Sequence, residues 1–234
     1  MSRIGLVVAT DGKLWNGEKE YGKHFIGKFQ QYDEKPNYDL FYAVTNQLPK
    51  IEDFHNYSGF VISGSHFSCN DPHPWITNLI NFVLAVHEYN KSQENKTVNL
   101  FGICFGHQLI AKAFGGRVEV TKHKKKFIFD CEQVEITEEV YRKQWFQQIF
   151  GDRKSFNIVE LHGDEVAMLP YNATRVGQSK SCLNEACLYD DGHIFTLQGH
   201  PEDLIDDVRD VKGPYLMKAK CITRMKMVVK FLTH

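Results

Sequence analysis

A cysteine lies at the centre of the motif Gly102-Ile103-Cys104-Phe105-Gly106, where an apolar segment is followed by a helical one. The two glycines suit a sharp turn from strand to helix, because a side chain at either position would crowd that turn. The amides of a first helical turn carry partial positive charge, which favours a thiolate over a thiol. The motif therefore predicts a nucleophilic cysteine on a strained turn.

A candidate base for this cysteine lies much further along the chain, in the segment Gly199-His200-Pro201-Glu202. Pro201 favours extended backbone at His200, and residues two apart in an extended chain point to the same side. Glu202 can therefore orient the imidazole of His200. A thiol nucleophile needs a base that takes and returns its proton, and a third group that fixes the tautomer of that base. Cys104, His200 and Glu202 supply these three roles.

An acyl-transfer site also requires hydrogen-bond donors aimed at the developing oxyanion. The amide of Phe105, directly after the cysteine, is one natural donor. The second is expected at the segment Ser63-Gly64-Ser65, because the backbone can approach a ligand closely at a glycine. Gly64 and Ser65 both remain candidates for it. By itself Ser-Gly-Ser is an ordinary turn, so it only supports the prediction.

Short runs of apolar residues without alternation predict the strands that position these residues. Such runs are typical of parallel strands that helices cover on both faces. The predicted strands span residues 4–9, 40–44, 59–63 and 98–104. Helices are predicted over 75–87 and 108–114. This alternation favours a doubly wound, mostly parallel α/β sheet, in which Cys104 and Gly64 follow the carboxyl ends of strands, where ligands bind.

After Gly116 the pattern changes to short strands separated by turns, which predicts an antiparallel or mixed extension of the sheet. These strands are predicted over 117–120, 127–136, 156–161, 174–178, 186–189 and 194–197. Helices are expected over 138–149 and 215–232. No Ser/Gly/Pro-rich linker or internal repeat divides the chain, so we expect residues 1–234 to form a single domain.

Composition argues against several classes of function. The chain has 42% hydrophobic and 24% charged residues and a formal net charge of -1, so nucleic acid and anionic membranes are not expected as partners. No apolar stretch approaches the roughly 20 residues of a membrane span. The six cysteines show no paired framework and no C-x-x-C, which favours a reduced, cytoplasmic protein.

A metal site is the remaining competitor. His66, Cys69, Asp71 and His73 lie close together in the sequence and could ligate zinc. Their spacing matches no closed zinc motif, so we expect neither a metal nor a cofactor.

The motif G-I-C-F-G-H-Q followed by G-H-P-E resembles the class I (triad) glutamine amidotransferases. The segments at 61–65, 71–76 and 162–166 resemble those of the GMP-synthase-like branch of that family. The resemblance implies a flavodoxin-like sheet and attack of a thiolate on a γ-glutamyl amide. A glutamyl thioester then forms, and water hydrolyses it. Cys104 would be the nucleophile, His200 the acid and base, and Glu202 the residue that orients it.

The resemblance also implies which residues hold the substrate. Gln108 and the loop His162-Gly163-Asp164 would bind the α-amino and α-carboxylate groups of the glutamyl moiety. These assignments depend partly on backbone atoms, unlike the three catalytic roles.

Two further features bear on the type of enzyme. The sequence contains no P-loop and no pyrophosphatase-type S-G-G-x-D-S segment, so a synthetase that uses the ammonia would have to be a separate subunit. The segments at 21–25, 65–67 and 182–187 resemble the stand-alone γ-glutamyl peptidases. We expect hydrolysis of γ-glutamyl bonds in glutathione, its conjugates or γ-glutamyl peptides. The alternative is a glutaminase subunit that delivers ammonia to a separate synthetase.

Other classes of protein fit less well. An α/β-hydrolase would place its acid well before a late histidine, whereas here Glu202 follows His200 by two residues. A non-catalytic binding module would not need all three residues of the catalytic set, and it predicts that Cys104→Ala leaves every function intact.

Overall fold

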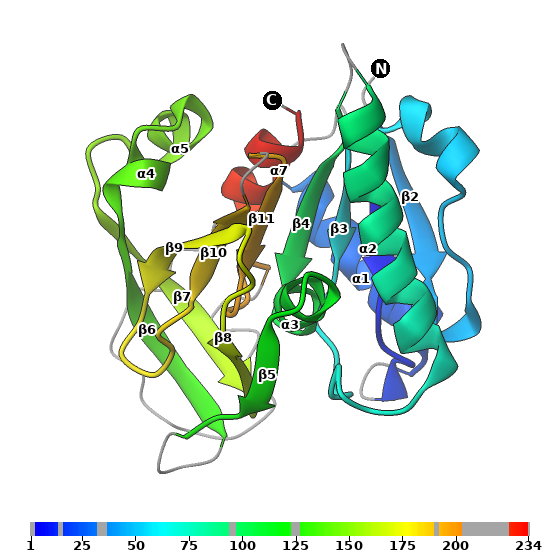
Figure 1. Ribbon diagram of the computed structural model, residues 1–234, viewed down its shortest axis with the longest axis horizontal. Helices are drawn as coiled ribbons and strands as arrows, with labels where there is room; N and C mark the ends of the chain where they lie inside the picture. Colours follow the sequence, from blue (N-terminus) through cyan, green and yellow to red (C-terminus); the bar gives the residue numbers. More distant parts are fainter. Residues whose placement is uncertain are drawn as a thin grey trace.

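Five parallel strands form one part of a nine-stranded sheet, in the order β2-β1-β3-β4-β11 (Figure 1). The computed structural model describes residues 3–13, 16–31, 37–93, 97–122, 127–189, 192–202 and 225–233. The parallel strands are β1 (Arg3–Val8), β2 (Asn37–Tyr42), β3 (Gly59–Ile62), β4 (Asn99–Ile103) and β11 (Ile194–Leu197). The predicted doubly wound sheet is confirmed.

Helices cover both faces of this sheet, as Figure 1 shows. They are α1 (Glu18–Gln30), α2 (Pro74–Ser92), α3 (Phe105–Ala113) and α7 (Met225–Thr233), with short turns η2 (Ala43–Thr45) and η3 (Ile51–Asn56). The buried side chains of α1 and α7 belong to one hydrophobic cluster, and those of α2 and α3 to the other. Among the described residues, no helix combines the length and apolarity needed to cross a membrane.

Four antiparallel strands extend the sheet beyond β11, and two more form a small sheet of their own. The extension consists of β10 (Ala186–Tyr189), β9 (Ala173–Gln178), β6 (Ile128–Ile136) and β7 (Ser155–His162). The small sheet pairs β5 (Arg117–Val120) with β8 (Asp164–Met168). The predicted antiparallel extension is confirmed, except that β11 pairs in parallel with β4.

Three local predictions differ from the structure. The helix expected over 138–149 is divided into α4 (Glu138–Tyr141) and α5 (Gln144–Phe150). The segment Asp164–Met168, expected as a loop, is a strand because its buried Val166 pairs with Val118 of β5. Of the helix expected over 215–232, the structure describes Met225–Thr233, and the earlier residues lie outside the described part.

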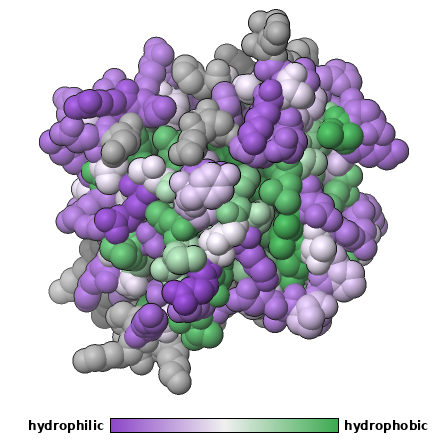
Figure 2. All heavy atoms as spheres, viewed as in Figure 1, coloured by the Kyte–Doolittle hydropathy of each residue, from purple (hydrophilic) through white to green (hydrophobic). Residues whose placement is uncertain are grey.

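The core lies between the sheet and its helices. On one face, Phe101 of β4 and Phe195 of β11 contact Phe231 of α7. On the other, Phe60 of β3 packs edge-on against Phe82 of α2. Hydrophilic residues predominate around the edge of the face in Figure 2, and hydrophobic ones show mainly towards its middle. Burial of these large side chains fixes the strand ends that carry the site.

Candidate active site

Cys104 occupies the turn between β4 and α3 in a strained backbone conformation, with φ 49° and ψ -100°. Positive φ is costly for a residue with a side chain and persists only where the surroundings impose it. Close packing imposes it here. A Cβ at Gly106 would lie 2.5 Å from the carbonyl oxygen of Ile62, and one at Gly102 would lie 2.7 Å from the carbonyl carbon of Gly106. The two glycines are therefore required for the turn.

His200 follows β11, the strand next to the one that ends at Cys104. The amide of Cys104 donates to the carbonyl of Leu197 at 2.8 Å, which ties the two strand ends together. Nδ1 of His200 donates to Oε1 of Glu202 at 3.0 Å. A Cβ at Gly64 would lie 2.9 Å from Cε1 of His200 and 3.6 Å from Cβ of Cys104. The structure thus brings Cys104, His200, Glu202 and Gly64 together.

The charges around His200 favour its protonated form. Burial by itself lowers the pKa of this imidazole, but the negative charges of Glu202 and Cys104 raise the pKa well above its ordinary value. The ring also lies within hydrogen-bonding reach of the Cys104 thiol. Because Nδ1 is occupied by Glu202, the other nitrogen is the one available to exchange a proton with the thiol.

Ser63 fixes the backbone of the segment expected to stabilise an oxyanion. Its hydroxyl donates to the carbonyl of Gly64 at 2.9 Å and accepts the amide of Ala9 at 3.0 Å. Ser65 lies at the edge of this segment, where its hydroxyl accepts the amide of Phe67 at 3.2 Å. Phe105 is the first residue of α3, so its amide lacks a helical partner four residues earlier.

The residues expected to bind substrate form one network around the carbonyl of Asp164. That oxygen accepts Nε2 of Gln108 at 2.8 Å and Nδ1 of His162 at 2.9 Å. The carboxylate of Asp164 accepts the hydroxyl of Ser68 at 2.6 Å, and the carbonyl of Gly163 accepts an amide at 2.8 Å. The side chains of Gln108 and His162 are buried and engaged with protein atoms.

Gln198 is a site residue to which the sequence assigned no role. Its Nε2 lies 3.6 Å from Sγ of Cys104, and its Oε1 accepts Nε2 of Gln108 at 3.1 Å. It precedes His200 by two residues, so strand alternation could have placed it on the same side. Sγ of Cys104 also donates to the carbonyl of Leu161 at 3.8 Å, a long-range contact that has no local sequence signal.

The four residues weighed as zinc ligands are committed elsewhere. Nδ1 of His66 pairs with Oγ1 of Thr10 at 3.2 Å, and His73 packs beside Trp75. Burial raises the pKa of the Cys69 thiol to about 12. Within the described ranges, no three His, Cys, Asp or Glu side chains are arranged to hold a metal ion.

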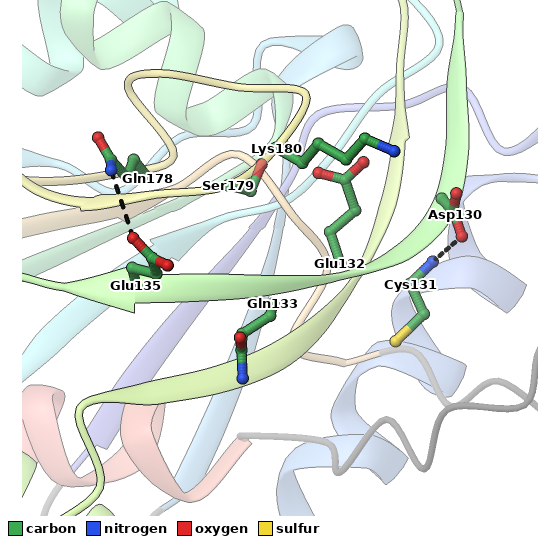
Figure 3. Close-up of a pocket in the computed structure, with 8 residues that line it drawn as sticks. All are labelled: Asp130, Cys131, Glu132, Gln133, Glu135, Gln178, Ser179 and Lys180. Atoms are coloured by element: carbon green, nitrogen blue, oxygen red, sulfur yellow. Dashed lines mark hydrogen bonds between the residues drawn. The ribbon is translucent and has the colours of Figure 1, made fainter.

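A hollow of about 530 Å³ lies away from these residues, over β6 and the loop that follows β9 (Figure 3). Its lining is largely polar. Glu135 accepts Nε2 of Gln178 at 3.5 Å, and Glu132 accepts the amide of Ser181 at 2.8 Å. None of the predicted site residues lines this hollow.

Comparisons with known proteins give this geometry a family context. The sequence model of the family Glutamine amidotransferase class-I matches residues 37–208. γ-Glutamyl peptidase 2 of Arabidopsis thaliana is 32% identical over 200 residues, covering 82% of this chain and 74% of that protein. One of the subunits of the glutamine-hydrolysing GMP synthase of Pyrococcus abyssi is 33% identical over 162 residues, covering 68% and 74%.

Solved structures share the fold. A glutamine amidotransferase from Thermotoga maritima superposes with a TM-score of 0.70 at 17% identity, covering 99% of this chain and 96% of that one. One from Methylobacillus flagellatus gives a TM-score of 0.68 at 19% identity, covering 100% and 89%. The flavodoxin-like arrangement of the sheet is thereby confirmed.

Proposed function

Because this chain belongs to the class I glutamine amidotransferase family, as its motifs predicted, we propose that it hydrolyses γ-glutamyl amide bonds through a thioester on Cys104. The observation that carries this proposal is the meeting of Cys104, His200 and Glu202 at the ends of two adjacent strands. Strain at the cysteine and the ordered contacts of the histidine support a nucleophile and its base.

The first half-reaction forms the acyl-enzyme. His200 takes the proton of the Cys104 thiol, and the thiolate attacks the γ-carbonyl carbon of the substrate. The amides of Phe105 and of Gly64 or Ser65 donate to the oxyanion of the tetrahedral intermediate. When that intermediate collapses, the carbon–nitrogen bond breaks and His200 returns the proton to the leaving amine. Glu202 keeps the imidazole in the required tautomer through its hydrogen bond to Nδ1.

The second half-reaction releases glutamate. His200 removes a proton from water, which attacks the thioester carbonyl, and the same amides stabilise the second oxyanion. Collapse breaks the carbon–sulfur bond and regenerates Cys104. The network of Gln108, His162 and Asp164 lies beside the nucleophile, where backbone atoms can hold the glutamyl α-amino and α-carboxylate groups.

For the substrate we favour glutathione, its conjugates or γ-glutamyl peptides. Four γ-glutamyl peptidases of Arabidopsis thaliana are 29–32% identical to this chain, and each match covers at least 82% of it. A glutaminase subunit that passes ammonia to a separate synthetase is the second candidate, because the GMP synthase subunit of Pyrococcus abyssi is 33% identical.

Release of free glutamate tests this proposal. The purified protein is incubated separately with glutathione, a γ-glutamyl dipeptide and glutamine, alongside the variants Cys104→Ala and Cys131→Ser. We expect turnover of the first two substrates by the parent and by Cys131→Ser, and none by Cys104→Ala. Strong turnover of glutamine alone, increased by an added synthetase, would contradict the peptidase activity and favour the second candidate.

A further inference from the structure

Two buried carboxyl groups lie behind the segment that carries His200. Glu160 on β7 and Glu185, just before β10, have no exposed surface. Their side chains hydrogen-bond to each other, which requires that one of them be protonated. Two adjacent carboxylates without solvent cannot both ionise at moderate cost, so the pair holds one proton between them.

Glu185 anchors the backbone directly before the catalytic histidine. Its Oε1 accepts the amide of Gly199 at 2.8 Å, and its own carbonyl accepts the amide of Gln198 at 2.8 Å. The amide of His200 itself donates to the carbonyl of Val159 on β7 at 2.8 Å. Position and orientation of His200 therefore depend on Glu185 and on β7.

Glu160 connects this anchor to the opposite wall of the site. Its Oε2 lies 3.5 Å from Nε2 of His162. Nδ1 of His162 donates to the carbonyl of Asp164, so Nε2 carries a lone pair and faces the carboxyl as an acceptor. The same carbonyl accepts Nε2 of Gln108 on α3, the helix that begins after Cys104. A proton on Glu160 thus lies between Glu185 and His162.

We propose that Glu160 and Glu185 are positioning residues that share one proton and, through Gly199, hold His200 in line with Cys104. Neither residue touches the substrate in this account. The activity readout rests on the proposed γ-glutamyl hydrolysis, whereas the arrangement itself does not.

The pair makes positioning of His200 dependent on pH. Burial raises the pKa of Glu160 to about 8, the negative charge of Glu132 raises it further, and His200 opposes the rise. Burial also raises the pKa of Glu185 well above its ordinary value. The ionisable groups that act on the pair are Glu132 and Cys131 on β6, His162 on β7, His200 after β11, and Cys182 and Cys187 around Glu185. As pH rises through about 8, the shared proton is lost and the two carboxylates repel.

The variant Glu160→Gln separates this effect from titration of His200. A glutamine amide can donate to Glu185 and to His162 without carrying a proton that is lost at high pH. We expect unchanged KM at neutral pH, and an alkaline limb of kcat that moves upward, with about threefold more retained activity near pH 9. If His200 alone sets that limb, removing a nearby negative charge lowers its pKa, and the limb moves down. A limb that moves down or stays in place overturns the proposal.

The amide of Gly199 provides a readout that needs no substrate. In ¹⁵N-labelled protein we expect its NMR shift to titrate with a midpoint of about 8 in the parent and not in Glu160→Gln. The control is Glu135→Gln, an exposed carboxylate on β6 (Figure 3) that leaves the titration in place. The same titration in parent and Glu160→Gln, or none in the parent, overturns the inference.

Anchoring is tested separately with Glu185→Ala and Glu185→Gln. Alanine leaves the Gly199 amide without its acceptor, so kcat should fall at least about tenfold with little change in KM, while glutamine restores most of it. Equal kcat in both variants would count against the anchor. If Gly199 titrates as expected but no γ-glutamyl donor is turned over, the positioning pair stands and the proposed function fails.

Discussion

At the scale of single residues, the site depends on how its immediate surroundings constrain Cys104 and His200. The backbone of Cys104 has φ 49°, and the helix that starts at Phe105 presents its amide dipoles to the sulfur. His200 is oriented by Glu202 on one side and by the carbonyl of Val159 on the other. Each of these contacts acts on proton transfer more than on substrate binding.

Replacing Glu202 tests the role of the orienting carboxylate. Glu202→Gln keeps the size of the side chain but removes the charge that favours protonated His200 and the acceptor that fixes its tautomer. We expect kcat for glutamate release to fall about 10²- to 10⁴-fold with KM changed much less. Steady-state kinetics on a γ-glutamyl dipeptide measures both constants. An unchanged kcat would remove Glu202 from the catalytic set.

At the scale of elements, the site depends on how closely α3 approaches β3. The first turn of α3 packs on the backbone of Ile62, and this contact leaves no room for a side chain at Gly106. The oxyanion segment follows β3 directly, so the same contact fixes its distance from the nucleophile. Gly27, inside α1, has open space around its Cα and serves as a comparison.

Alanine at these two glycines should have opposite effects on stability. Gly106→Ala forces a Cβ to within 2.5 Å of a backbone oxygen, so we expect the free energy of unfolding to fall by about 2 kcal/mol or more. Gly27→Ala removes backbone freedom from the unfolded chain and should raise it by about 0.5–1 kcal/mol. Urea denaturation of both variants measures the difference. Equal stabilities would show that the close approach at Gly106 is not required.

The elements also show what the sequence could predict. Strands buried on both faces have unbroken apolar runs, so the parallel sheet and the strand ends at Cys104 and Gly64 were predictable. Helix α1 was not predicted, although Tyr21, Phe25 and Phe29 recur every four residues, because two glycines weaken its helical pattern. The contacts of Gln198 and Glu185 with the site are set by tertiary packing between distant segments, which no local pattern encodes.

At the scale of the whole molecule, helices on both faces enclose polar groups whose ionisation then depends on folding. His107 on α3 lies fully buried between the helix and β11, where its Nδ1 pairs with the hydroxyl of Thr196 at 2.8 Å. Burial, together with the charge of His162, lowers the pKa of His107 to about 3. The folded protein therefore binds fewer protons at this residue than the unfolded chain.

This linkage predicts loss of stability in acid. Between about pH 6.5, the ordinary histidine value, and about pH 3, the unfolded state binds the extra proton, so stability is full above this window and falls on acidification. The loss attributable to His107 across the window is on the order of 4 kcal/mol.

Denaturation midpoints of the parent and of His107→Gln over this range check the prediction. Glutamine can still pair with Thr196 but does not titrate, so its stability should fall less steeply with pH. A parallel His55→Gln variant, at an exposed position, should follow the parent. Identical acid slopes in the parent and His107→Gln would rule out this source of the pH dependence.

Mass spectrometry of acid-quenched protein tests most directly whether Cys104 forms the γ-glutamyl thioester. The protein is mixed with glutathione, a γ-glutamyl dipeptide or glutamine, quenched during turnover, digested and mapped. We predict a mass increase of one glutamyl group on the peptide that contains Cys104, with the peptidyl donors as well as glutamine, and its absence in Cys104→Ala. Turnover of a γ-glutamyl peptide without any adduct on Cys104, or at an unchanged rate in Cys104→Ala, would contradict the account.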